Sequence, residues 1–378
     1  MAPSFGNLDL LVEKQRLIVC VGSGGVGKTT SAAAIGLRAA MRGRRVLVLT
    51  IDPARRLANS LGLTEFGNTE VRIDLGERAS GELWAMMLDA PSTLDDVIRR
   101  VAKDDVTREA IFANKIYRHM AGSFSGSQEY MATERLYDVY GSDRYDLIVL
   151  DTPPVKNALD FLESPGRLVR FLDRQIMKWF LTPYEEEKVF GKRFLMGTSS
   201  VVYRLLGHIF GREFLDELSV FFALFRDLYD GFRERHEAVG RLFAATTTSF
   251  LVVSAPTEPS VDVARFFLDE LRTRKLPVGG VVVNQVHMAT TAVPDVDALL
   301  GPGARALDAA TSGPLLARLG AAHRRLRELA ALEAARVEEL RRASGVATWL
   351  RVIPRHPEEV HDLEGLLRLH RDLFDTPS

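Results

Sequence analysis

The chain has only one cysteine, Cys20, among its 378 residues. A single thiol excludes an intramolecular disulfide framework and any metal site built from several cysteines. Cys20 belongs to the apolar run 17–21, so we expect it to be a small, buried residue of a strand. The chemistry of this protein must therefore rest on other side chains.

Neither sign of charge is in excess, because 49 Lys and Arg stand against 50 Asp and Glu. A general nucleic-acid binder needs an excess of positive charge to hold a polyanion, so we expect no nucleic-acid partner. The composition is otherwise that of a folded protein, with 46% hydrophobic and 26% charged residues. Global disorder is thereby excluded.

A long hydrophobic segment is also missing. The uncharged run 242–257 has 16 residues and contains several Ser and Thr, so it is too short and too polar to span a membrane. The N-terminus reaches the acidic Asp9 after a few apolar residues, which does not fit a signal peptide. We therefore expect no integral membrane segment and a cytoplasmic location.

Short apolar runs alternate with helical segments along the chain. Runs of this kind are typical of strands buried on both faces of a parallel sheet, so we predict an α/β fold with a mostly parallel, twisted sheet flanked by helices. Polar residues follow several runs, at the end of the sheet where such folds bind ligands. The predicted strands are 17–21, 46–51, 83–88, 147–150, 250–253, 278–283 and 349–353.

The middle of the chain changes character. Leucines and aromatic residues recur there at helical spacing, so we expect residues 161–239 to form a helical insertion subdomain. The core would then be discontinuous, made of residues 1–160 and 240–378. Within its C-terminal part, residues 304–342 alternate Ala and Leu with Arg and Glu, which predicts a helical hairpin.

The apolar side chains of the predicted insertion allow two interpretations. They either pack together as a helical core or line a groove for a hydrophobic helix of a client protein. Helical spacing alone is compatible with both. The side chains concerned are Met177, Trp179, Phe180, Met196 and the phenylalanine-rich stripe 214–232.

The segment GSGGVGKT, residues 22–29, has the pattern G-x-x-x-x-G-K-[ST] between a predicted strand and a predicted helix. Its glycines let backbone N–H groups surround phosphates, and the helix N-terminus favours an anion. Lys28 is placed to reach the outer phosphates and Thr29 to ligate Mg²⁺. The fold is thus expected to be that of a P-loop NTPase, whose nucleotide would contact Gly22, Ser23, Gly24, Gly25, Val26, Gly27, Lys28, Thr29 and Thr30.

Asp151 closes the predicted strand YDLIVLD and precedes Thr152-Pro153-Pro154. A carboxylate at this position would hold Mg²⁺ through a water molecule, with the following turn beside the outermost phosphate. A lone Asp after a strand indicates little. Together with the loop 22–29, it indicates a magnesium-nucleotide site.

Several segments resemble the arsenite-pump (ArsA) ATPase family. These are GSGGVGKTT, TIDPARRLANSLG and YDLIVLDTPPVKNALDFL, followed by VVVNQ at 281–285 and VIPRHPEEVHDLEGL. The family includes the ATPase that targets tail-anchored membrane proteins and belongs to the wider deviant-Walker group. The segment GSQEYMA at 126–132 resembles bacterial single-copy members in particular.

The resemblance implies ATP and Mg²⁺ as ligands and assigns roles to individual residues. Lys28 would bind the phosphates in a catalytic role, and Thr29 and Asp151 would hold Mg²⁺. Asp52 matches the switch aspartate that orients or deprotonates the attacking water, although a turn-forming role before Pro53 is the alternative. Asn284 would read the adenine edge and Pro354 would pack on the adenine ring.

The chain departs from the family pattern at the loop, where Ser23 replaces a lysine that reaches the phosphates of the partner subunit. The resemblance therefore implies slow hydrolysis in a homodimer, unless a paralogous subunit or Arg55 or Arg56 supplies the cation. The family's zinc-binding and arsenite-binding cysteines are absent as well. We accordingly reject zinc-linked dimerisation and activation by arsenite.

The function that the resemblance implies is a Mg-ATP-hydrolysing dimeric ATPase, working as a nucleotide-driven switch on a protein client or partner. It would be a homodimer or a heterodimer with a paralogous ATPase, and a hydrophobic helix is a candidate client. The alternative is a weakly hydrolysing, nucleotide-dependent scaffold. A partition-type ATPase and a small-molecule kinase fit the sequence less well, because the amphipathic C-terminus carries several aspartates and the loop is of the dimer type.

Overall fold

The structure is a computed structural model that describes residues 8–51, 56–61, 68–118, 127–153, 211–226, 229–288, 309–345 and 348–375. Its centre is an eight-stranded sheet in the order β3-β4-β2-β5-β1-β6-β7-β8. All neighbouring strands are parallel except β3 and β4. The predicted α/β fold class is confirmed. The strands are β1 (Leu17–Gly22), β2 (Arg45–Thr50), β3 (Val71–Ile73), β4 (Glu82–Met87), β5 (Leu147–Asp151), β6 (Thr248–Ser254), β7 (Val278–Val286) and β8 (Leu350–Pro354).

The central strands are buried on both faces because their side chains point alternately to two separate apolar layers. Leu17 and Val19 of β1 belong to one layer, and Ile18 and Cys20 to the other. Cys20 is fully buried, and burial, followed by the charge of Asp151, raises the pKa of its thiol. Cys20 is therefore a packing residue of the strand, as predicted, and an unreactive thiol.

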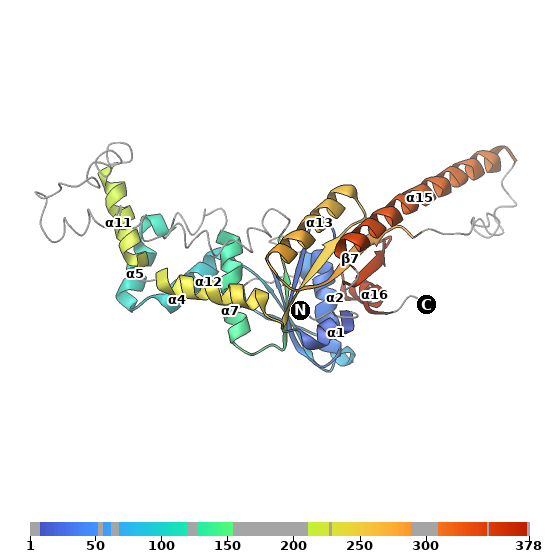
Figure 1. The fold of residues 1–378 in the computed structure, drawn as a ribbon. Helices are drawn as coiled ribbons and strands as arrows, with labels where there is room; N and C mark the ends of the chain where they lie inside the picture. The colour runs from blue at the N-terminus through green and yellow to red at the C-terminus, as the bar shows by residue number, and fades with distance from the viewer. Residues whose placement is uncertain are drawn as a thin grey trace, which may run out of the picture.

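Helices cover both faces of the sheet (Figure 1). On one face lie α1 (Leu8–Lys14), α2 (Lys28–Met41), α3 (Arg56–Ser60) and α16 (Leu363–Phe374). A short 3₁₀ helix spans Gly76–Arg78. The other face carries α7 (Ser127–Gly141), α12 (Tyr229–Ala244), α13 (Glu258–Thr273) and α15 (Ala309–Ser344), whereas α4 (Ala90–Val101), α5 (Asp105–Ala113) and α11 (Arg212–Arg226) extend this layer away from the sheet (Figure 1).

The described part of the predicted insertion is helical. The predicted boundary between 239 and 240 falls inside α12, which packs on α7 and β6 and leads directly into β6. Arg235 fixes α12 to α7 through ion pairs with Glu134 (3.0 Å) and Asp138 (3.1 Å). The division into a core and an insertion subdomain stays a prediction.

The phenylalanine-rich stripe of α11 contains both packed and exposed side chains. Phe221 and Phe222 are buried and contact one another edge to face, whereas Phe214 is 41% exposed. The described part of the stripe therefore contributes to a core and also reaches the surface. Met177, Trp179, Phe180 and Met196 lie outside the described residues.

The expected helical hairpin at 304–342 is wrong for the described residues, because α15 is one continuous helix of 36 residues. Between 315 and 344 the sequence has no proline and only one glycine, Gly320. A single glycine weakens a helix without ending it, and the Ala, Leu, Arg and Glu around it are strong helix formers. The N-terminal half of α15 projects beyond the sheet (Figure 1).

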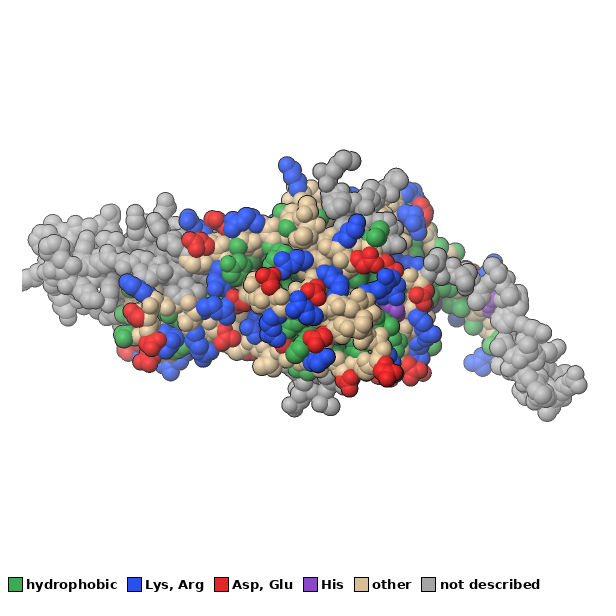
Figure 2. Space-filling view, turned by 90° about the horizontal axis from the view of Figure 1, so that it is seen from below, with side chains coloured by type: hydrophobic (Ala, Val, Ile, Leu, Met, Phe, Trp, Pro, Cys, Tyr) green, Lys and Arg blue, Asp and Glu red, His purple; other side chains and the backbone are tan. Residues whose placement is uncertain are grey.

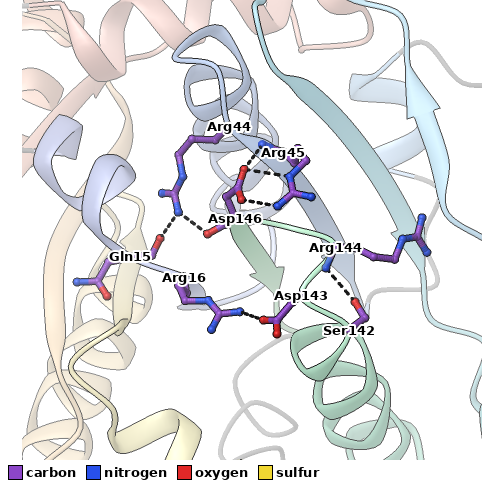
Figure 3. Close-up of polar contacts among 8 residues, drawn as sticks. All are labelled: Gln15, Arg16, Arg44, Arg45, Ser142, Asp143, Arg144 and Asp146. Carbon is purple, nitrogen blue, oxygen red and sulfur yellow. Dashed lines mark hydrogen bonds and ion pairs between the residues drawn. The ribbon is translucent and has the colours of Figure 1, made fainter.

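A network of arginines closes the end of the sheet opposite to the carboxyl ends of the central strands (Figure 3). Arg44 donates to the carbonyl oxygens of Val12, Gln15 and Asp146, the second at 2.8 Å. Arg45 pairs with the Asp146 carboxylate at 2.8 Å, and this hydrogen bond lowers the pKa of the carboxyl group. The network holds the α2–β2 turn against the starts of β1 and β5.

His370 of α16 is buried at 5% exposure, with its ring centroid 5.1 Å from that of Phe374. Burial, and next the charge of Arg38, lowers the pKa of the imidazole. The unfolded chain takes up a proton at His370 near pH 6.5, about the pKa of a free histidine, whereas the folded chain does so only at lower pH. The contribution of neutral His370 to the free energy of unfolding is therefore complete above about pH 6.5. It is lost as the pH falls toward the lower pKa that His370 has in the folded chain.

Substitution of His370 by leucine is accordingly expected to flatten the pH dependence of stability. Urea unfolding midpoints between about pH 5 and pH 8 would measure this effect, with the wild-type midpoint falling more steeply at the acid end. His361→Leu is the matched control, because the His361 side chain is 67% exposed. An acid-side slope that His370→Leu leaves unchanged would contradict the assignment.

Candidate functional site

The loop between β1 and α2 has a backbone that only glycine accommodates. Gly25 and Gly27 have positive φ values of 76° and 90°. A Cβ on Gly27 would lie 2.3 Å from Nδ2 of Asn284, and one on Gly22 would lie 2.0 Å from the carbonyl oxygen of Val253. No side chain caps the N-terminus of α2, so its first-turn N–H groups are available to an anion.

Lys28, Thr29 and Asp151 converge at the carboxyl ends of β1 and β5. Lys28 Nζ donates to the carbonyl oxygen of Ser23 at 2.9 Å, so its stem crosses the loop. Thr29 Oγ1 donates to Asp151 Oδ2 at 2.6 Å, and Thr50 Oγ1 donates to the same oxygen at 2.9 Å. A hydroxyl and a carboxylate in contact are hard oxygen ligands, so the donor set fits Mg²⁺.

Ser23 is tied to helix α13 of its own chain. Its Oγ donates to Ser260 Oγ at 3.1 Å, and Ser260 Oγ also accepts a hydrogen bond from Thr257 Oγ1 at 2.9 Å. Ser254 Oγ donates to the Ser260 carbonyl oxygen at 3.1 Å. Ser23, where the resemblance implies a lysine, is therefore part of a hydroxyl network with the first turn of α13.

A bulge in β7 brings two consecutive amide side chains onto the loop. The register with β8 shifts between Val283 and Val286, and Gln285 has a positive φ of 63°. Asn284 Nδ2 donates to the carbonyl oxygen of Val26 at 3.0 Å, and Gln285 Nε2 donates to that of Gly25 at 3.2 Å. The amide of Asn284, which we expected at the adenine edge, thus binds the loop in this structure.

Gln285 belongs to the resembling segment VVVNQ, but the sequence analysis gave it no role of its own. The positive φ at the bulge turns its side chain toward Gly25. We infer that Gln285 supports the loop backbone.

A cavity of about 530 Å³ joins the loop to the segment after β8, and its size is typical of small-molecule sites. It unites the expected phosphate-binding and adenine-binding residues. The segment 355–361 adds charged side chains that the sequence analysis had not assigned. The cavity is lined by Gly25, Gly27, Lys28, Thr29, Thr30, Ser60, Asn284, Gln285, Pro354, Arg355, His356, Glu358, Glu359, Val360, His361 and Leu369.

The segment that carries the expected catalytic aspartate is only partly described. Asp52 and Arg55 lie outside the described residues, and the side chain of Arg56 is likewise not described. Ile51, which precedes them, donates its backbone N–H to the carbonyl oxygen of Asp151 at 3.1 Å. The role of Asp52 therefore stays a prediction.

In the described ranges, no group of three or more His, Cys, Asp or Glu side chains is arranged to hold a metal ion. Among the helices in that same part of the chain, none has the length and apolar character needed to cross a bilayer.

Comparison with known proteins identifies one family. The model of the family described as anion-transporting ATPase (ArsA ATPase) matches residues 15–297, a stretch that contains the loop, Asp151 and Asn284 but not Pro354. An ATPase ASNA1 homolog of Plasmodium berghei is 26% identical over 294 residues, which cover 77% of this chain and 68% of the relative.

Two further relatives match shorter stretches. A putative arsenical pump-driving ATPase 2 of Aquifex aeolicus is 31% identical over 180 residues, covering 45% of this chain and 56% of the relative. An ATPase get3 of Aspergillus terreus is 30% identical over 158 residues, covering 42% of this chain and 45% of the relative. The matches thus span about half to two thirds of each relative's length.

Proposed function

The chain belongs to the family of anion-transporting ATPases and is an ATP hydrolase, and we propose that it works as a Mg-ATP-driven dimeric switch on a protein client or partner. The observation that carries this proposal is the convergence of Lys28, Thr29 and Asp151 at the end of β1 and β5. These side chains lie where the outer phosphates of a nucleotide on the α2 N-terminus would be.

Each residue of the site has a separate role in binding or hydrolysing the nucleotide. Lys28 would bind the outer phosphates, while the Thr29 hydroxyl and, through a water molecule, the Asp151 carboxylate would hold Mg²⁺. When bound, Mg²⁺ neutralises charge on the transferred phosphoryl group. Asp52 accepts a proton from the attacking water. Pro354, which lines the same cavity, would pack on the adenine, and Asn284 would read the adenine edge only after its amide leaves the Val26 carbonyl oxygen.

Activation by arsenite does not fit this chain. A metalloid site of this kind needs thiolates, and the sequence contributes only Cys20. That thiol is fully buried inside β1, and its pKa is raised by burial. We therefore propose that a protein partner, and not a metalloid, is the output of the switch. The exposed Phe214 and the apolar residues of the predicted insertion support a hydrophobic helix as the client.

Ser23 favours a second candidate function, that of a weakly hydrolysing, nucleotide-dependent scaffold. The Ser23 hydroxyl supplies no positive charge to a transition state and is bonded to Ser260 of the same chain. In this alternative the chain binds ATP and changes partner affinity, with turnover supplied only by a lysine-bearing paralogue.

Molar mass in each nucleotide state tests the dimeric switch. Light scattering would be recorded without nucleotide, with Mg-ADP and with Mg-ATP, for the protein alone and mixed with a paralogous ATPase. We expect Mg-ATP to double the molar mass of the protein. After wild-type protein has hydrolysed the ATP and returned to monomer, Asp52→Asn should still show the doubled mass. Asp105→Asn is a control, because that carboxylate lies on α5 and is 81% exposed. A mass that nucleotide never changes, alone or mixed, overturns the switch.

A further inference from the structure

Helix α15 has two halves with opposite surroundings. From residue 330 onward, one face of it is buried against α13 and β7 through Ala330, Val337 and Leu340. Before residue 330 the same face leaves the core, as the projecting end of α15 in Figure 1 shows. Leu319 and Leu326 are 39% and 40% exposed there.

The exposed half continues a coiled-coil pattern. Leu319 and Leu326 are seven residues apart, as are Ala322 and Leu329, so the four occupy positions a and d of two successive heptads. Leu329 is 38% exposed. We call residues 317–329 the arm. Its leucines form a narrow apolar seam that nothing in the described part of the chain covers.

Basic side chains lie along one side of this seam. Residues 309–327 contain four arginines and no Asp or Glu. Arg318 and Arg325 are seven residues apart and take the g positions beside the seam, whereas Arg324 and Arg327 take the outer positions f and b. On the face of the core seen from below, positively and negatively charged side chains are mixed (Figure 2).

The arginines of the arm have no hydrogen-bond or ion-pair partner among the described residues. Two of the three arginines of the anchored half are engaged, since Arg336 donates to the carbonyl oxygen of Pro256 at 3.2 Å and Arg341 pairs with Glu338 at 3.4 Å. The arm therefore carries four arginines against the single acidic residue Glu328, and Arg318 and Arg325 lie along one side of the apolar seam.

We propose that the arm docks an acidic amphipathic helix of another protein. Its apolar residues pack on the leucine seam, and its Asp or Glu side chains pair with Arg318 and Arg325. A second copy of this chain fits poorly. An antiparallel copy sets arginine against arginine at g, and a parallel copy sets Arg318 and Arg325 against His323 and Ala330 at e.

The anchored half links the arm to the nucleotide site. Glu333 of α15 accepts the backbone N–H of His287 at 2.7 Å, and its other oxygen lies 2.9 Å from His287 Nδ1. His287 follows Gln285 in the chain by two residues, and Gln285 donates to Gly25 of the loop. Docking itself needs no nucleotide, and only its control by ATP rests on the proposed function.

Binding of a defined peptide to the full chain tests this proposal. The probe is a labelled peptide of about 21 residues with Leu at a and d and Glu at e and g, and its counterpart carries Lys in place of Glu. Fluorescence anisotropy should detect the acidic peptide and not the basic one. Arg318→Glu combined with Arg325→Glu should weaken binding of the acidic peptide about tenfold or more, and allow the basic peptide to bind.

Arg324→Glu combined with Arg327→Glu is the matched control, with the same charge change on the outer face of the same helix. It should reduce affinity for the acidic peptide far less. Leu319→Ser combined with Leu326→Ser should weaken binding without altering either charge pattern. Circular dichroism and ATPase rate, both expected to be unchanged, separate a failure of docking from a failure of the proposed function.

Three results would overturn the proposal. The first is no binding of the acidic peptide to the wild-type chain. The second is an equal loss in the two arginine pairs, which would indicate general electrostatic attraction. The third is binding of the wild-type chain to phosphatidylserine vesicles, if the double variant Arg318→Glu, Arg325→Glu loses vesicle binding but keeps peptide binding. That result would make the arm a membrane-surface helix.

Discussion

Replacing Lys28 with alanine is expected to lower the affinity for Mg-ATP by about a hundredfold or more, because charge-assisted contacts to phosphate are strong. Lys28 is only 7% exposed, and its Nζ is held over the loop by the Ser23 carbonyl oxygen at 2.9 Å. Among the described residues that line the cavity, Lys28 is the one lysine. Titration calorimetry with a slowly hydrolysed ATP analogue would measure the loss.

Two controls separate phosphate binding from a general effect on the fold. Lys103→Ala removes an exposed lysine and should leave nucleotide affinity unchanged. Lys28→Arg keeps the charge but alters its geometry, so it should bind more weakly than wild type. If Lys28→Ala binds the analogue as tightly as wild type, the loop is not the phosphate site.

Introduction of a lysine at position 23 is expected to have the largest effect on turnover. A cation supplied to the transition state across a subunit interface commonly contributes ~10³–10⁵ in rate. Ser23→Lys should therefore accelerate hydrolysis by a homodimer, and a lysine-bearing paralogue should accelerate the unaltered chain. Steady-state phosphate release with saturating Mg-ATP is the measurement.

The contact between Ser23 and Ser260 determines the controls for this experiment. Any long side chain at 23 must leave the hydrogen bond to Ser260 Oγ. Ser23→Met has the length of lysine without its charge, and Ser260→Ala removes the bond without adding bulk. Neither should accelerate turnover. If wild type hydrolyses ATP rapidly and Ser23→Lys gives no gain, Arg55 and Arg56 become the candidates for the cation. A slow wild type that neither intervention accelerates would favour the scaffold.

The sheet and the phosphate loop could be predicted because each depends on local sequence. A strand such as β5 is a continuous apolar run because both its faces are buried. The pairing of Thr29 with Asp151 follows because β1 and β5 are parallel neighbours, so the start of α2 after β1 meets the end of β5 at the same edge of the sheet. β3 was missed because it has three residues and pairs antiparallel at the edge, where no long apolar run is required.

The remaining features of the site depend on contacts between distant segments. Ser23 and Ser260 are 237 positions apart, and Gln285 and Gly25 are 260 apart. Their meeting requires the correct strand order and a bulge at one position of β7, neither of which has a local signature. The hairpin expected in place of α15 failed for another reason. A hairpin turn would be needed only if both halves of the segment packed on the core. The N-terminal half of α15 instead extends away from the core (Figure 1).

The contact of Glu333 with His287 divides α15 into a long N-terminal part and a short C-terminal part. Ala309 lies 24 residues before Glu333, which at 1.5 Å per residue corresponds to about 36 Å. A tilt of about 5° at the His287 contact would displace the far end by about 3 Å, because displacement grows with distance from the pivot. Small adjustments of β7 beside the loop are thus magnified at the tip, where they become large enough to reposition whole side chains.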